Sequence, residues 1–116
     1  MKAVELAKRI YNRRKKYFEN SEEYFRIIKT RAKNILGKDA KIFVFGSLVR
    51  KDYHPMISDI DIAVVSKDIP KRAIERAKTK LKLKKGFEFS PFEIHLLNKK
   101  EWQTYKKFID TYNEVF

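Results

Sequence analysis

Two aspartates one residue apart stand at the start of an apolar run, in the segment SDIDIAVVS at residues 58–66. Side chains alternate between the faces of a strand, so a strand here places Asp59 and Asp61 on one face, about 6 to 7 Å apart. Like charges at that spacing repel each other, and a divalent cation that prefers hard oxygen ligands, Mg²⁺ or Mn²⁺, compensates them. The alternative for such a pair alone is a strand with a solvated polar face.

A glycine and a serine directly follow another apolar run, KIFVF at residues 41–45. Gly46 allows the backbone to approach a phosphate closely, and amides at a helix start near Ser47 can donate hydrogen bonds to it. Taken alone, this pair indicates only a turn. Together with the downstream aspartates, it indicates a phosphate site beside a metal site.

A third carboxylate, Glu93, lies in the extended segment 87–97 and shares a strand face with His95. Glu93 therefore becomes a further candidate metal ligand if the two segments are neighbours in one sheet. His54 and His95 are isolated histidines, a pattern more typical of ordinary polar residues than of metal ligands. His95 is the better candidate of the two to line a site, because it shares the face of Glu93.

The elements that must position these residues form a mixed α/β pattern, with a small sheet backed by helices and an additional helix at the N-terminus. Apolar residues at helical spacing predict the helices, Gly37 and Gly86 end two of them, and Pro91 interrupts the third extended segment. The predicted elements are helices over 3–18 and 21–36, strands over 41–45 and 58–66, a helix from 70 to 86, the extended segment 87–97 and a last helix from 99.

The length of 116 residues favours one domain, expected to comprise a helical part (1–38), a core (41–97) and a C-terminal helix (99–116). With 43% hydrophobic residues the chain can bury a core, and it has no apolar run long enough to cross a bilayer. It has no cysteine, and the segment MKAVELAKRIYNRRKK lacks the apolar part of a secretory signal. These features predict a cytoplasmic protein without disulfides or thiolate metal sites.

Basic residues strongly outnumber acidic ones, 28 against 15, which gives a net charge of +13. A polyanionic partner such as a nucleic acid is one explanation. The other is the lysine-rich composition of a heat-adapted or AT-rich organism, which implies no particular partner. The tyrosines near the C-terminus and Trp102 are expected in the core rather than in a base-stacking platform.

The order of these motifs resembles the nucleotidyltransferase superfamily related to DNA polymerase beta, and more narrowly its minimal archaeal and bacterial members. The resemblance covers about half of the chain, residues 41–97. Lys51 departs from the pattern, because members often carry a second glycine there, and Glu93 stands where aspartate is usual. The loop before Asp59 is also about one residue longer than the commonest form. The matching residues are Gly46, Ser47, Arg50, Asp52, Ser58, Asp59, Asp61 and Glu93.

The resemblance implies an enzyme that transfers a nucleotide, AMP being expected, from an NTP to an acceptor hydroxyl with release of pyrophosphate. It implies that Asp59 and Asp61 hold two Mg²⁺ or Mn²⁺ ions and that Glu93 completes the second metal site and assists in taking the proton. Gly46 and Ser47 would bind the β and γ phosphates of the NTP, typically ATP. Arg50 would balance charge on the leaving group.

The resemblance also implies possible acceptors and partners. Minimal members are often encoded beside a small helical HEPN protein and act as its antitoxin by modifying it, whereas others modify small molecules or RNA ends. A chain of this size suggests that a homodimer or a partner completes the site. The alternative function is a catalytically inactive module of the same fold that binds a protein or RNA; the three carboxylates argue against it, since they weaken phosphate binding unless metals compensate.

Overall fold

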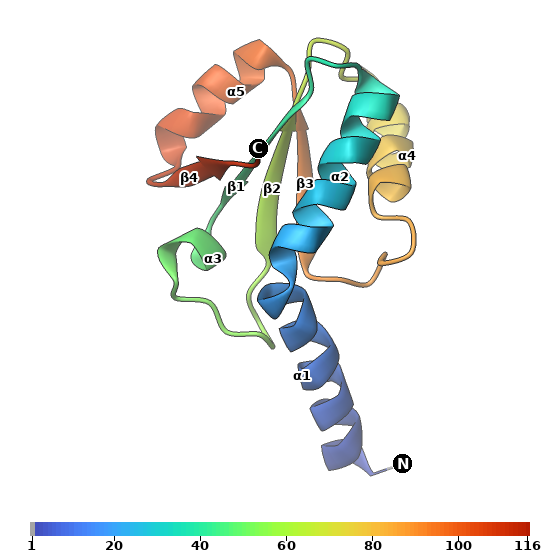
Figure 1. Cartoon of the computed structure of the whole chain (residues 1–116), viewed down its shortest axis with the longest axis vertical. Helices are drawn as coiled ribbons and strands as arrows, with labels where there is room; N and C mark the ends of the chain where they lie inside the picture. Colours follow the sequence, from blue (N-terminus) through green and yellow to red (C-terminus); the bar gives the residue numbers. More distant parts are fainter. Residues whose placement is uncertain (1) are drawn as a thin grey trace.

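The computed structural model describes residues 2–116, and its elements form a mixed sheet with helices on both faces (Figure 1). One short 3₁₀ turn, Lys106–Phe108, follows the last helix. The elements are α1 (Ala3–Glu19), α2 (Ser21–Leu36), β1 (Lys41–Phe45), α3 (Ser47–Arg50), β2 (Ile60–Val65), α4 (Ala73–Leu83), β3 (Phe92–Leu97), α5 (Lys99–Tyr105) and β4 (Tyr112–Glu114).

The four strands form one sheet in the order β3-β2-β1-β4. β2 pairs antiparallel with β1 and parallel with β3, while β4 pairs antiparallel with the far edge of β1. The predicted α/β class with a small mixed sheet backed by helices is confirmed. In this register Asp61 of β2 lies between Phe45 of β1 and Glu93 of β3, so the pairing itself brings two of the candidate carboxylates side by side.

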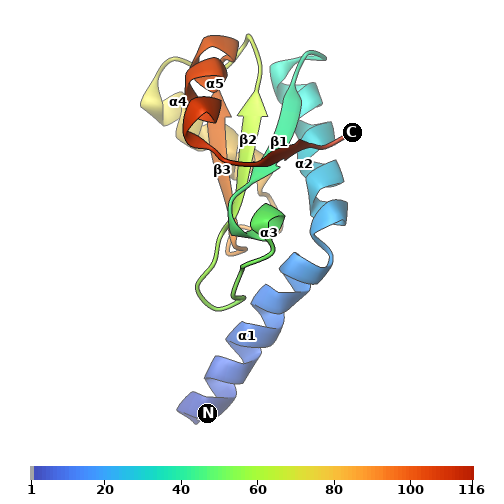
Figure 2. The ribbon, with the colours of Figure 1, turned by 90° about the vertical axis from the view of Figure 1, so that its left-hand side faces the viewer.

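The amino-terminal helix predicted from the apolar spacing is present, but only its carboxyl-terminal end joins the core. Phe18 is buried, whereas Val4, Leu6 and Ile10 are exposed. Figures 1 and 2 show the first half of α1 extending away from the sheet. None of the helices in residues 2–116 has both the length and the apolar composition that a membrane span requires.

Two predicted boundaries shift in ways that matter for the site. The second strand begins at Ile60 rather than Ser58, so Asp59 lies just before it. The third strand begins at Phe92, directly after Pro91, which is where a residue without a backbone donor is expected to stop pairing. The helix expected from residue 70 begins at Ala73 and ends at Leu83, short of Gly86.

The prediction of a helix over 99–116 is wrong beyond its first two turns. α5 ends at Tyr105, and the last residues instead add the short strand β4 to the edge of β1. The backbone of an edge strand has unpaired donors and acceptors, and pairing them favours an extended segment there. The Val115 N–H, for example, donates to the Ile42 carbonyl at 2.9 Å.

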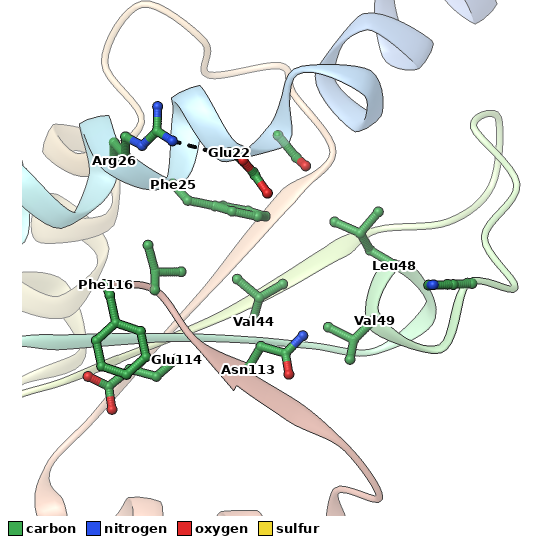
Figure 3. A pocket seen from close by; sticks show the side chains of 12 residues that line it. Glu22, Phe25, Arg26, Val44, Leu48, Val49, Asn113, Glu114 and Phe116 are labelled. Carbon is green, nitrogen blue, oxygen red and sulfur yellow. Dashed lines mark ion pairs between the residues drawn. The ribbon is translucent and has the colours of Figure 1, made fainter.

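β4 also closes one side of a cavity of about 410 Å³ between the sheet edge, α2 and α3 (Figure 3). Phe25, Val44 and Leu48 line it, and an exposed ion pair between Arg26 and Glu22 lies at its rim. Val44 pairs with Ile62, so this cavity opens on the sheet face opposite to that of Asp61.

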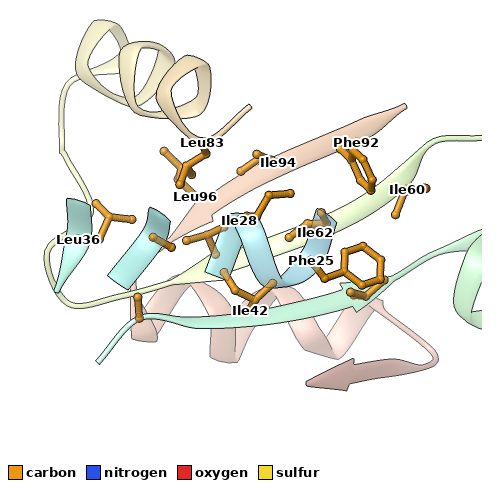
Figure 4. Close-up of a cluster of buried hydrophobic side chains, with 14 of the residues drawn as sticks. Phe25, Ile28, Leu36, Ile42, Ile60, Ile62, Leu83, Phe92, Ile94 and Leu96 are labelled. Atoms are coloured by element: carbon orange, nitrogen blue, oxygen red, sulfur yellow. The ribbon is translucent and has the colours of Figure 1, made fainter. Parts of the chain in front are cut away.

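Strand alternation divides the core into two clusters, one on each face of the sheet. Ile42, Ile62 and Ile94 point toward α2 and α4 and make the larger cluster (Figure 4). On the other face Phe43 stacks on Trp102 of α5, with ring centroids 4.6 Å apart. Trp102 is 4% exposed, which confirms it as a core residue. α5 covers only part of this second face, and the polar residues of β2 and β3 lie on it.

Candidate functional site

Three side chains that can ligate a metal meet on the α5 face of the sheet, from β2 and β3. Asp61, Glu93 and His95 each offer a ligand atom, and these atoms all lie within 4.8 Å of one another. The parallel register sets Asp61 beside Glu93, and strand alternation returns His95 to the same face two residues later. We call these three residues the acidic cluster.

His95 lies at the centre of the acidic cluster. Its Nε2 atom is 3.3 Å from Asp61 Oδ1 and 3.9 Å from Glu93 Oε1, and its Nδ1 atom is 3.5 Å from the hydroxyl of Tyr105. The side chains of Asp61 and His95 are 24% and 22% exposed, whereas Glu93 is 54% exposed. Glu93 is therefore the member of the cluster that solvent reaches most easily.

Carboxylates in and near the cluster act on two neighbouring groups. Burial, reinforced by the carboxylates of Asp61 and Glu93, raises the pKa of the Tyr105 hydroxyl, which keeps it protonated. Burial lowers the pKa of Lys84, and the charges of Asp59 and Glu93 oppose that change. The Lys84 ammonium donates to the Phe92 carbonyl at 2.7 Å, so it lies beneath the start of β3.

Gly46 lies so close to Asp61 that a side chain at this position would displace the carboxylate. Its φ of +86° is one that residues with a Cβ rarely adopt, and a Cβ built there would collide with Asp61 Oδ2. β1 and β2 pair up to Phe45 and Asp61, so the chain must turn away directly beside that carboxylate. The glycine at the end of the first strand is therefore explained by the aspartate in the second.

A cavity of about 450 Å³ opens beside this contact, and Gly46, Arg50 and Asp61 line it together with Tyr105. Ser47 begins α3 at the same turn. The guanidinium of Arg50 pairs with Asp52 at 3.2 Å, and both side chains are about half exposed or more. An ion pair in solvent contributes little energy, so Arg50 can exchange Asp52 for an anionic ligand. The other residues that line this cavity are Phe45, Phe108, Ile109, Asp110 and Thr111.

Asp59 lies outside the acidic cluster that residues 2–116 form. It is exposed, it precedes the first residue of β2, and its charge acts on Lys84. Of the three carboxylates predicted to meet, the structure thus brings Asp61 and Glu93 together and leaves Asp59 outside their cluster, just before the strand.

Lys51 adopts the left-handed conformation with φ 64° and ψ 27° at the end of α3. It is the one residue other than glycine with a positive φ within residues 2–116. Lys51, which stands where family members often carry a second glycine, thus lies at a position whose backbone conformation favours glycine. The loop nevertheless keeps the turn, with the Lys51 N–H donating to the Leu48 carbonyl at 3.2 Å.

The donor set of the acidic cluster fits a divalent cation. Two carboxylates supply hard oxygen ligands, the imidazole of His95 suits Mn²⁺ or other transition metals, and a cation would relieve the repulsion between Asp61 and Glu93. The sequence singled out both carboxylates but only noted His95 as lining the site. His95 lies two residues after Glu93, so the two side chains share one strand face. If a parallel neighbouring strand carries Asp61 on that face, this spacing predicts that His95 belongs to the same cluster.

Sequence patterns do not reveal the positions of Lys84 and Tyr105 beside the cluster. Lys84 is one of several lysines in the run KTKLKLKK, and no local pattern distinguishes it from its exposed neighbours. Tyr105 packs against the second core cluster, as the sequence predicts, but it is only half-buried and its hydroxyl also faces His95.

Comparison with known proteins gives the class to which this site belongs. Residues 21–114 match the family described as nucleotidyltransferase domain, which covers most of the chain and leaves α1 outside the match. The chain therefore belongs to the nucleotidyltransferase family, and the resemblance inferred from the sequence is confirmed. No curated protein matches the chain.

Two solved structures share this fold. A crystal structure of a candidate nucleotidyltransferase is 38% identical, with a TM-score of 0.64, over 79% of this chain and 97% of that one. A second, from Sulfolobus solfataricus, also a candidate nucleotidyltransferase, is 21% identical, with a TM-score of 0.57, over 87% of this chain and 80% of that one. The first similarity supports the family, whereas the second shows the fold alone.

Proposed function

We propose that the protein transfers AMP from ATP to a hydroxyl group of a protein or RNA acceptor, with Mg²⁺ or Mn²⁺ and with release of pyrophosphate. The observation that carries the proposal is that Asp61 belongs to the acidic cluster with Glu93 and also lines the cavity beside Gly46. Nucleotidyl transfer needs metal ligands and room for a triphosphate at the same place, and this arrangement supports the proposal.

The residues proposed to hold two divalent ions are Asp59, Asp61 and Glu93, with His95 as an additional ligand. Bound there, the ions would neutralise the triphosphate and lower the pKa of the acceptor hydroxyl. Glu93 is the most exposed member of the cluster, and we propose that it accepts the proton of an acceptor that approaches from solvent. Asp61 is less exposed and is fixed between its neighbours on β1 and β3.

The proposed nucleotide site is the cavity that Gly46 and Arg50 line. Backbone amides at Gly46 and Ser47 can donate to phosphate oxygens, because the glycine leaves no side chain in the way. Arg50 would stabilise charge on the departing pyrophosphate once it leaves Asp52. Phosphate contacts of this kind do not distinguish bases, so ATP is proposed from the family resemblance rather than from a base pocket.

Among acceptors, we propose a small helical HEPN protein that this chain would modify as its antitoxin, with RNA as the other class. The open side of the cluster at Glu93 supports a macromolecular acceptor, and the net charge of +13 suits an anionic one.

The test is transfer of label from α-³²P-labelled ATP, CTP, GTP or UTP in Mg²⁺ to RNA and to the protein encoded by the neighbouring gene. We expect labelled acceptor and stoichiometric pyrophosphate with the wild type, and neither with Asp61→Asn. If Asp61→Asn transfers label as well as the wild type does, the proposed site is wrong. A wild type that binds the neighbouring protein but labels nothing would favour an inactive binding module.

A further inference from the structure

A loop over residues 53–58 connects the turn after α3 to Asp59, and α1 holds it. The Arg14 guanidinium donates to the Pro55 carbonyl at 2.5 Å and to the Ser58 carbonyl at 2.6 Å. One turn later on the same helix, Phe18 stacks on Tyr53 with ring centroids 4.6 Å apart and ring planes 9° from parallel.

Inside the loop, hydrogen bonds only close a local turn. The His54 carbonyl accepts from the N–H groups of Ile57 and Ser58, and the His54 N–H donates to the Ser58 hydroxyl at 2.7 Å. Among the hydrogen bonds of residues 2–116, the two from Arg14 are the ones that join residues 53–58 to another element. Arg14 and Phe18 therefore fix where this turn lies relative to the sheet.

One of the two carbonyls that Arg14 binds belongs to Ser58, whose peptide bond leads directly into Asp59. From the other side, the Ile60 N–H donates to the Pro91 carbonyl at 2.8 Å. The backbone of Asp59 is thus held by α1 on one side and by the segment before β3 on the other. With the backbone held, the Asp59 carboxylate can move toward Asp61 by rotation about the side-chain bonds of Asp59.

We infer that Arg14 is a positioning residue for the site: it holds the backbone at Ser58 so that Asp59 can join Asp61 and Glu93 in binding a divalent cation. This inference rests on the proposed function for its catalytic consequence. α1 lies outside the segment that matches the family, residues 21–114, so this support comes from outside the matched domain.

The chemistry of the contact explains why arginine is needed. A planar guanidinium presents several N–H groups in fixed directions and can bind two carbonyls at once, whereas a lysine ammonium is a single point donor on a flexible stem. Arg14 is half-buried at this contact, which protects both hydrogen bonds from competition by water.

The test compares Arg14→Ala with Arg13→Ala, the exposed neighbour, which removes the same charge from the same helix. Tyr53→Ala removes the stacking contact without changing charge, and Arg14→Lys keeps the charge with poorer geometry. We expect the hydrogen-bonded amides of residues 54–60 to exchange hydrogen at least tenfold faster in Arg14→Ala and Tyr53→Ala, at an intermediate rate in Arg14→Lys, and at the wild-type rate in Arg13→Ala.

The same variants are titrated with Mn²⁺ alone and assayed for transfer. We expect Arg14→Ala to bind Mn²⁺ several-fold more weakly and to lose about tenfold in kcat with KM for ATP within twofold of wild type. If the loop amides of Arg14→Ala exchange at the wild-type rate, the inference is wrong. It is also wrong if Arg14→Ala binds Mn²⁺ as tightly as Arg13→Ala or more tightly. If the wild type transfers no nucleotide, the proposed function fails, while the exchange and Mn²⁺ measurements still decide the positioning role.

Discussion

Gly46 lies beside the Asp61 carboxylate, so adding a single methyl group at this glycine should disturb the site. Gly46→Ala adds a Cβ that would collide with Asp61 Oδ2, in addition to the strain of a positive φ. Gly86→Ala is the matched control. Gly86 also has a positive φ, +94°, but a Cβ at that position would meet no atom within 4 Å.

Both variants are expected to lose about 1 to 2 kcal/mol of unfolding free energy from the backbone strain. Gly46→Ala is expected in addition to displace Asp61 and to lower nucleotide transfer at least a hundredfold, a size typical for a lost electrostatic contact in an active site. Chemical denaturation and the labelled-ATP assay measure the two effects. Equal transfer by the two variants would show that the contact with Asp61 has no role in activity.

The second prediction at this scale concerns His95, which the sequence only marginally suggested. If its ring ligates a metal beside Asp61 and Glu93, His95→Ala should weaken Mn²⁺ binding about tenfold or more, as loss of a ligand or of its orienting partner does. His54→Ala is the control, because that ring is exposed and bonds only within its own loop. Isothermal titration with Mn²⁺ measures both; identical affinities would exclude His95 from the metal site.

At the scale of elements, α5 begins with a capping box that also ties it to α4. The Asn98 side chain accepts from the Glu101 N–H, and Glu101 accepts from the Asn98 N–H and pairs with Arg76 at 3.2 Å. The hydrogen bond from the Asn98 N–H, with a further contribution from Arg76, holds the pKa of Glu101 below its ordinary value of 4.5. α5 carries Tyr105 to the site, so this cap supports the site at a distance.

A lowered pKa means that the charged form of Glu101 stabilises the fold above the ordinary pKa and that this stability is lost as the pH falls through the lower, folded pKa. We expect Glu101→Gln to cost about 0.5 to 1 kcal/mol at pH 7, since the pair is partly exposed and the glutamine can still cap. The cost should shrink once the pH falls below 4.5. Urea denaturation at several pH values tests this, with exposed Glu75→Gln as control; a cost that stays constant down to pH 3 would contradict it.

The elements that local patterns determine were predictable from the sequence, and the one that depends on a distant partner was not. α1 and α2 follow from apolar residues at helical spacing, and β1 and β2 from short apolar runs. β4 forms because Tyr112–Glu114 meets the free edge of β1 at Phe43–Phe45, a pairing that helical periodicity in the preceding residues conceals.

The same limit applies to the site. Strand alternation predicted that Glu93 and His95 share a face, but only the parallel pairing of β2 with β3 shows that this face also carries Asp61. The sequence pattern also placed Asp59 within a strand, whereas the strand begins at Ile60. The carbonyl before Asp59 is instead bound by Arg14, in a helix that is more than forty residues away in the chain.

At the scale of the whole molecule, the net charge of +13 predicts how the protein should respond to salt. If an RNA acceptor binds through its phosphates, each neutralised phosphate releases counterions, and affinity for single-stranded RNA should fall about tenfold or more between roughly 50 and 200 mM salt. Fluorescence anisotropy with a labelled oligonucleotide measures this slope. If salt does not change the affinity for RNA, the positive charge of the protein is not the source of acceptor binding.

At the same scale, we propose that the fold brings a divalent cation and a triphosphate together between β2, β3 and the turn at Gly46. Anomalous diffraction from a crystal grown with Mn²⁺ and an ATP analogue that cannot be cleaved at the α phosphate locates the metal directly. We predict an anomalous peak bound by Asp61 and Glu93, with the phosphates in the cavity beside Gly46. A manganese peak elsewhere, or a nucleotide bound away from these carboxylates, would contradict this arrangement.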